Sequence, residues 1–241
     1  MSLPCYNEFF SPPSRPERSS FHAWWLASRD YLRSLSIYDS DTLVQYQRAS
    51  QLINNYLSGS LDEIKNIDID RARNDVLKQF NYLYIVKPGL REAKFPPDDP
   101  EWLQKCLHLM QDDIQRIIAG APPTTTPFMV YRGLQKPFGT LSGTRRRYAG
   151  FLSTSGDHNM SSEFLGRYGN LLCITVPPGQ RCLLLGAFRV QRECEVLFGP
   201  RTEMQIDAYD SQRSKLFEGK NPLFVTIVRN EPVTGVKRAR S

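Results

Sequence analysis

The sequence predicts an α+β fold, with helices in the first half of the chain and strands in the second. In three segments between Ser20 and Gly120, apolar residues recur every three or four positions, as on the buried face of an amphipathic helix. After Thr126 the pattern changes to short runs rich in Val, Ile, Leu, Phe and Tyr, separated by Gly, Pro and charged clusters. Helices first and strands later are typical of an α+β layout.

The first helix is expected from Ser20 onward. A second follows the polar run DSDT at residues 39–42, which we interpret as a capping cluster. For the third, Asp99 is a suitable N-cap, Pro100 a suitable first residue, and Gly120 with the prolines after it ends the helix. The predicted apolar stripes are Trp24, Trp25, Tyr31, Leu32 and Leu35; Leu43, Tyr46, Ala49, Ile53 and Tyr56; and Trp102, Leu103, Cys106, Met110, Ile114, Ile117 and Ile118.

Seven strands are predicted from the later part of the chain. They cover residues 128–132, 150–155, 171–176, 182–185, 193–198, 204–209 and 223–228. No repeat or low-complexity block interrupts them.

The composition is that of a folded protein. The 241 residues are enough to bury a core without covalent staples, and 13 Phe, 11 Tyr and 3 Trp argue against disorder. A net charge of +6 favours anionic partners, such as nucleotides, nucleic acid or acidic protein surfaces, without deciding among them.

Cysteines and histidines are scattered and give no metal-binding pattern. The five cysteines include no CxxC pair, and the three histidines are far apart, so we expect reduced thiols and no metal. The first 20 residues lack the apolar core of a signal peptide, and no run approaches the roughly 18 apolar residues of a membrane span. We expect a soluble, intracellular monomer with no membrane partner.

The first segment that carries chemistry is VYRGL at residues 130–134. Arg132 leaves a predicted strand beside Gly133, where its rigid donor fork can bind phosphate or carboxylate oxygens while the glycine lets a ligand approach the backbone. A solvated arginine before a turn is the alternative.

The second segment is GFLSTSG at residues 150–156. Apolar residues lead into Ser153, Thr154 and Ser155, whose hydroxyls can orient carboxylates and ribose hydroxyls. A plain strand end that runs into a turn explains this segment equally well.

The third segment is ECEVLF at residues 193–198. In a strand Glu193 and Glu195 point to the same side, roughly 6–7 Å apart, and Cys194 points away. Two carboxylates on one face repel each other unless water, a cation or a substrate uses them. A solvated outer face remains the alternative.

Together and in this order, the segments resemble the arginine–serine–glutamate group of mono-ADP-ribosyltransferases, which includes bacterial toxins, phage and viral enzymes and vertebrate ecto-enzymes. The residues that carry the resemblance are Arg132 in VYRG, Ser153 in STS, and Glu193 and Glu195 in the E-x-E pair before VL. The resemblance implies an ADP-ribosyltransferase fold, in which N-terminal helices precede a split, bent and mainly antiparallel β-sheet with NAD in its cleft.

The resemblance also fixes the expected domains. Residues 43–59 are similar to an early helix of the family, and SEFLG at 162–166 to a later one, so the catalytic domain is predicted at 43–230. Residues 1–42 form an arm and a helix of unknown role, and 231–241 a basic flexible tail. The short gap between Arg132 and Ser153 is similar to the compact members of the family.

The resemblance assigns six residues to binding of NAD, which is a substrate, and one of them is the catalytic glutamate Glu195. Arg132 binds the pyrophosphate or the adjacent ribose, and the backbone of Gly133 meets the nicotinamide carboxamide. Ser153 orients the catalytic glutamate, and Thr154 supports the strand end beside NAD. Phe164 packs on the nicotinamide ring, unless it is an ordinary core phenylalanine.

The same resemblance assigns the chemistry to the two glutamates. Loss of nicotinamide leaves positive charge on the ribose, and a fixed carboxylate that accepts a hydrogen bond from the ribose 2′-hydroxyl stabilises that charge. Glu195 is expected in this role. A protonated guanidinium attacks poorly, so Glu193 is expected to orient the acceptor arginine and take its proton. Phe188, in the loop 186–192, would contact the protein substrate.

The resemblance therefore implies transfer of ADP-ribose from NAD to a protein arginine, with release of nicotinamide. Three alternatives stay open. The first is an NAD glycohydrolase or a transferase with another acceptor, and the second is a catalytically dead binding module. The third is a nucleic-acid binder. Only Arg145–Arg147 and the basic tail support it, so nucleic acid is not an expected partner.

Overall fold

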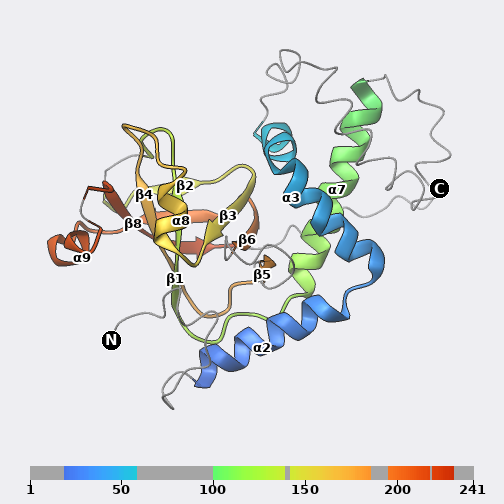
Figure 1. Ribbon diagram of the computed structural model, residues 1–241, viewed down its shortest axis with the longest axis horizontal. Coiled ribbons are helices and arrows are strands. Elements are labelled where there is room, and N and C mark those ends of the chain that lie inside the picture. The colour runs from blue at the N-terminus through green and yellow to red at the C-terminus, as the bar shows by residue number, and fades with distance from the viewer. Residues whose placement is uncertain (1–18, 59–99, 139–141, 186–194, 218, 231–241) are drawn as a thin grey trace. The chain divides into compact units, whose positions relative to one another are not determined.

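The computed structural model describes residues 19–58, 100–138, 142–185, 195–217 and 219–230 (Figure 1). The chain divides into two compact units. One combines Met1–Arg33 with Ile118–Ser241, and the other is Ser34–Ile117.

The unit Ser34–Ile117 contains helix α3 (Ile37–Leu57) and most of helix α7 (Pro100–Gly120). As predicted, α7 begins at Pro100, although Asp99 lies outside the described residues. Of the predicted stripe residues that are described in this unit, Leu35 is only half-buried. The others are buried, namely Leu43, Tyr46, Ile53, Met110, Ile114 and Ile117. The side chains of Ala49, Tyr56, Trp102, Leu103 and Cys106 are not among those described.

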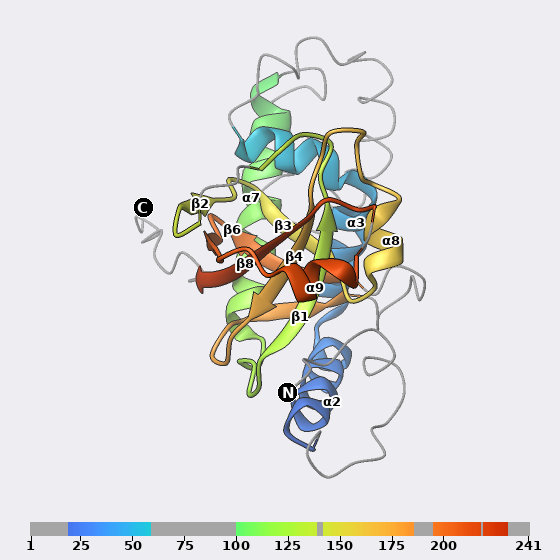
Figure 2. The same cartoon turned by 90° about the vertical axis from the view of Figure 1, so that its left-hand side faces the viewer.

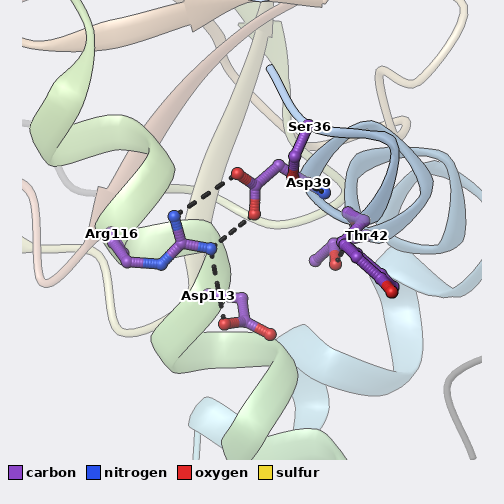
Figure 3. A network of polar contacts seen from close by, with 6 residues as sticks. Ser36, Asp39, Thr42, Asp113 and Arg116 are labelled. Carbon is purple, nitrogen blue, oxygen red and sulfur yellow. Dashed lines mark hydrogen bonds and ion pairs between the residues drawn. The ribbon is translucent and has the colours of Figure 1, made fainter. Parts of the chain in front are cut away.

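Helix α3 begins earlier than the sequence predicts, because Ser36 caps it in place of residues 39–42. The backbone N–H of Asp39 donates to Ser36 Oγ at 3.2 Å, the bond expected of an N-cap serine three residues ahead. Asp39 lies in the first turn, where its charge is favourable, and accepts two hydrogen bonds from Arg116 of α7 (Figure 3). Arg116 also lies 3.6 Å from Asp113, and Thr42 Oγ1 donates back to the carbonyl of Tyr38.

The second unit contains helix α2 (Ser19–Ser34) up to Arg33 and one mixed sheet with two short helices. The described strands and short helices are β1 (Phe128–Gly133), β2 (Arg145–Arg147), β3 (Phe151–Ser155), α8 (His158–Ser162), β4 (Leu171–Val176), β5 (Cys182–Leu184), β6 (Glu195–Pro200), β7 (Glu203–Ile206), α9 (Ser211–Lys215) and β8 (Pro222–Arg229).

The eight described strands lie in the order β2-β7-β8-β4-β1-β3-β6-β5. Figure 2 shows β1, β4 and β8 at the centre of this sheet. Of the pairings between described strands, β4 with β8 is the parallel one and the rest are antiparallel. The predicted α+β class, with helices followed by a mainly antiparallel sheet, is confirmed.

Three short elements were not predicted. Strand β2 consists of Arg145–Arg147, which carries no apolar pattern and which we read as a plain charge run. It pairs with β7, where Glu203 lies 3.8 Å from Arg145 and 3.9 Å from Arg147. Helices α8 and α9 span five residues each, too short for a helical period to be visible. Strand β7 ends at Ile206, earlier than predicted.

Helix α2 packs on the sheet through Trp24. This side chain is buried, its ring stacks on Phe128 at 4.9 Å, and its indole N–H donates to the carbonyl of Pro122. Elsewhere in the same unit, a buried cluster joins Tyr131 of β1, Cys173 of β4, Phe224 of β8 and Phe217 after α9. Both faces of β1 and β4 are therefore covered.

None of the helices in the described parts of the chain is long and apolar enough to span a bilayer.

Candidate active site

The sheet is almost divided in two where β1 meets β3. These strands share the single residue pair Tyr131–Ser155, whereas β1 pairs with β4 along six residues, from Phe128–Val176 to Gly133–Leu171. On one side of this junction lie β2, β7, β8, β4 and β1, and on the other β3, β6 and β5. Beyond the single pair, backbone groups of β1 and β3 need other hydrogen-bond partners.

Arg132 supplies one of these partners. It follows Tyr131 on β1, and its Nη1 donates to the backbone carbonyl of Ser153 on β3. A side-chain donor thus takes the position that a ladder N–H would hold in a continuous sheet. The other terminal nitrogen, Nη2, donates to the hydroxyl of Tyr148 at 2.7 Å, and the guanidinium carbon lies 5.0 Å from the centre of that ring.

Ser153 links the junction to the buried carboxylate. Its hydroxyl donates to Glu195 Oε1 at 2.8 Å. Glu195 is the first described residue of β6, lies opposite Ser155 in the ladder, and is only 8% exposed. A carboxylate this buried must be hydrogen-bonded or it is strongly destabilised, so the serine both orients and stabilises it.

The two hydroxyls after Ser153 hold the backbone at the same end of β3. Thr154 Oγ1 is buried and donates to the carbonyl of Val196 at 2.7 Å. Ser155 Oγ accepts from the backbone N–H of Asp157, and Asp157 caps α8 by accepting from Asn159 N–H. The STS segment is therefore the end of a strand, its first hydroxyl on Glu195 and the next two on neighbouring backbone.

Gly133 lies against the turn that follows α8. A β-carbon placed on Gly133 would lie 2.1 Å from the carbonyl oxygen of Ser161 and 3.0 Å from the backbone of Phe164 and Leu165. Gln135 strengthens this contact, since its Nε2 donates to the carbonyl of Phe164 at 2.8 Å. Phe164 is 56% exposed, so it is not an ordinary core phenylalanine, and its backbone lies close to Gly133.

His158, the first residue of α8, forms a second polar pair with Lys220. Lys220 Nζ lies 3.0 Å from His158 Nδ1 and 3.0 Å from Asn159 Oδ1, and the imidazole makes a T-shaped contact with the ring of Tyr131, with 5.6 Å between the ring centres. Burial and the neighbouring positive charge of Lys220 lower the pKa of His158, whereas Asp157 opposes this shift. The neutral imidazole is therefore favoured beside the junction.

Neither of the two cysteines whose side chains the structure describes offers a reactive thiol. Cys173 and Cys182 are both buried and reduced, and burial raises the pKa of Cys173 to about 12 and that of Cys182 still further. The described part of the chain also contains no group of three or more His, Cys, Asp or Glu side chains that could hold a metal ion.

The structure thus brings together three of the four residues on which the resemblance depends, Arg132, Ser153 and Glu195. Glu193 and Phe188 lie outside the described residues. Tyr148 was missed, because an isolated tyrosine between a basic run and an apolar strand carries no signal in the sequence.

No family model and no curated protein sequence matches the chain. Solved structures do match it. The catalytic domain of VahC from Aeromonas hydrophila is 23% identical, with a TM-score of 0.51, over 80% of this chain and 100% of that one. Plx2a, an ADP-ribosyltransferase toxin from Paenibacillus larvae, is 14% identical, with a TM-score of 0.54, over 88% of this chain and 96% of that one.

A third match is the ADP-ribosylating toxin BECa of C. perfringens, solved with NADH. It is 13% identical, with a TM-score of 0.53, over 89% of this chain and 49% of that one. Likeness at this level of identity concerns the fold, and it confirms the fold that the resemblance implied. The chain has the fold of the ADP-ribosyltransferases.

Proposed function

We propose that the protein is an NAD-dependent mono-ADP-ribosyltransferase that transfers ADP-ribose from NAD to an arginine of a protein substrate and releases nicotinamide. The observation that carries this proposal is the hydrogen bond between Ser153 and the buried Glu195, placed at the split of the sheet that Arg132 bridges. An arginine, a serine and a glutamate from three strands meet there on an ADP-ribosyltransferase fold.

Arg132 is suited to bind an anionic part of NAD. Two of its nitrogens are hydrogen-bonded within the protein, whereas its Nε–H is buried and has no partner among the residues that the structure describes. An unsatisfied buried donor costs about 1–3 kcal/mol, and a phosphate oxygen would satisfy it if NAD binding moves the side chain enough to expose this nitrogen. The solved BECa structure contains NADH, which supports a nicotinamide dinucleotide as the ligand.

Glu195 is suited to stabilise the positive charge that forms on the ribose as nicotinamide leaves. Its carboxylate is buried and oriented by Ser153, so it would need little reorganisation during the reaction. A carboxylate in such a place accepts a hydrogen bond from the ribose 2′-hydroxyl. This role is common to transfer and to hydrolysis of NAD.

Glu193 is proposed to select arginine as the acceptor. It stands two residues before Glu195, so in an extended chain its carboxylate points to the same side. There it would orient the guanidinium and accept its proton during attack. Phe188, in the loop before it, would contact the protein substrate.

The decisive experiment incubates the protein with labelled NAD and either agmatine, a small guanidino acceptor, or a cell lysate. We expect release of nicotinamide, label on agmatine, and label on an arginine side chain located by mass spectrometry. Glu195→Ala should abolish both nicotinamide release and labelling. Glu193→Gln should abolish labelling and leave part of the NAD hydrolysis.

Other results lead to other functions. Nicotinamide release without any labelled acceptor would indicate an NAD glycohydrolase, and label on another side chain would refute the choice of arginine. Equal loss of transfer and hydrolysis in Glu193→Gln would refute the division of roles between the glutamates. A wild-type protein that binds NAD and releases no nicotinamide would be a binding module.

A further inference from the structure

Tyr148 contacts Arg132 in two ways at once. Its hydroxyl accepts from Nη2 at 2.7 Å, and its ring lies beneath the guanidinium at 5.0 Å from the carbon. The hydrogen bond fixes the position of one terminal nitrogen, and the cation–π contact holds the guanidinium over the face of the ring. With Nη1 on the Ser153 carbonyl, the orientation of Arg132 is set at three points.

The backbone of Tyr148 is itself held by a hydrogen bond. Its backbone N–H donates to the carbonyl of Thr202 at 2.8 Å. Thr202 is fully buried in the turn between β6 and β7, where its hydroxyl donates to the carbonyl of Gly199 at 2.7 Å. The backbone of Tyr148 is therefore anchored to a buried turn.

We propose that Tyr148 is a positioning residue that holds the Arg132 guanidinium in the orientation in which it binds NAD. The inference rests on the proposed function and adds a residue to it. A free arginine side chain loses rotamer freedom when it binds a ligand, and this loss weakens binding. Because Tyr148 and the Ser153 carbonyl already restrict Arg132, little of that loss remains for NAD binding.

This role predicts an effect on NAD affinity and not on the chemical step. Tyr148→Phe keeps the ring under the guanidinium and deletes the acceptor of Nη2. Loss of a hydrogen bond to a charged group should raise the KM and Kd for NAD about tenfold. Tyr148→Ala also deletes the ring, which should weaken binding by about a further threefold to tenfold. The value of kcat should stay within about threefold of wild type, because Glu195 and Ser153 are unchanged.

The control is Tyr209→Phe, which removes the same hydroxyl from a side chain that is 77% exposed. For the wild type and the three variants, kcat and KM for NAD are measured by nicotinamide release, Kd for NAD by calorimetry, and Tm by differential scanning calorimetry. We expect the wild type and Tyr209→Phe to bind NAD equally well, Tyr148→Phe to bind it more weakly, and Tyr148→Ala to bind it most weakly. The intermediate affinity of the Phe variant would be partial rescue by the retained ring.

If Tyr148→Phe, and Tyr148→Ala where it folds, have the KM and Kd of the wild type for NAD, the inference is overturned. The proposed function would then remain intact. The same holds if kcat falls and KM does not change, because the residue would then act on the chemical step. If Tyr148→Ala does not fold, the Phe variant alone decides. A wild-type protein that neither binds nor cleaves NAD would refute both proposals together.

Discussion

The two neighbours of β1 are bound to it by different means. Toward β4 the strand makes a ladder of six residue pairs, and β4 in turn pairs with β8 through five residue pairs. Toward β3 it makes one pair, and the next connection is the Arg132 side chain on the Ser153 carbonyl. In the first region backbone groups hold the strands together, and in the second the connection depends on particular side chains.

This difference determines what each region requires of its residues. Five of the six residues of β4 are apolar and buried, and the exception is the half-buried Thr175. For buried apolar residues such as Leu172 and Ile174, side-chain volume determines how well they pack. At the junction the buried residues include Thr154, Ser155 and Glu195, so hydrogen-bonding chemistry is what counts. We expect substitutions in the ladder region to affect stability and substitutions at the junction to affect activity.

Glu195→Gln should give the largest effect, since it removes a charge and keeps the shape of the side chain. We expect loss of nicotinamide release by about 10²–10³-fold or more, the scale of a lost transition-state electrostatic contact. The measurement is nicotinamide by liquid chromatography, with circular dichroism as the check on folding. A folded variant within tenfold of wild type would show that the buried carboxylate is structural.

Ser153→Ala should give the next largest effect. The carboxylate of Glu195 loses the hydroxyl that orients it at 2.8 Å, while the backbone carbonyl that Arg132 uses remains. We expect kcat to fall about 10–100-fold, because a charge-assisted hydrogen bond is lost and the carboxylate is less well oriented. If Tm falls steeply while kcat in the folded fraction stays at the wild-type value, the junction behaves like the ladder region.

Ile174→Ala tests the other side of the comparison. Ile174 is fully buried in β4, opposite Val130 on β1 and Val225 on β8. We expect the free energy of unfolding to fall by about 2–5 kcal/mol, as for other truncations of buried aliphatic side chains. Urea denaturation measures this change. Below the transition, KM for NAD should match wild type, and a large rise in KM would mean that ladder packing also positions the site.

His158 should give the smallest effect, through the pH dependence of stability. Its pKa in the folded protein is lower than the ordinary value of 6.5, so the unfolded chain binds more protons at intermediate pH. Its contribution to stability is therefore complete above about pH 6.5 and is lost as pH falls toward the folded pKa. Scanning calorimetry from pH 8 to pH 5 should show a fall in Tm that is reduced in His158→Asn.

Most of the ladder region could be predicted from the sequence, and the junction only in part. Strand β4 was predicted to the residue, because its apolar run is bounded by turn residues on both sides. The predicted start of α3 was wrong, because several polar residues between 36 and 42 can cap a helix and only the folded geometry shows that Ser36 does so. The contact of Tyr148 with Arg132 joins residues 16 positions apart and depends on where the sheet divides, which no local pattern encodes.

Strand β2 illustrates the same limit. Its three arginines form a strand only because β7 offers an edge and because Glu203 faces two of them. Pairing of this kind is decided by a partner more than fifty residues away along the chain. By contrast, the resemblance carried by Arg132, Ser153 and Glu195 was sufficient to predict the fold, because those residues stand at fixed places within it.

The close fit of Gly133 against the turn after α8 has a practical consequence for mutagenesis. A single methyl group at this position would collide with the main chain of another segment, which cannot rotate away as a side chain can. Alanine substitution at Gly133 would therefore displace the turn that carries Phe164, and any lost activity would report that displacement. Phe164→Leu, which alters only an exposed ring, is the cleaner probe of what that turn contributes to catalysis.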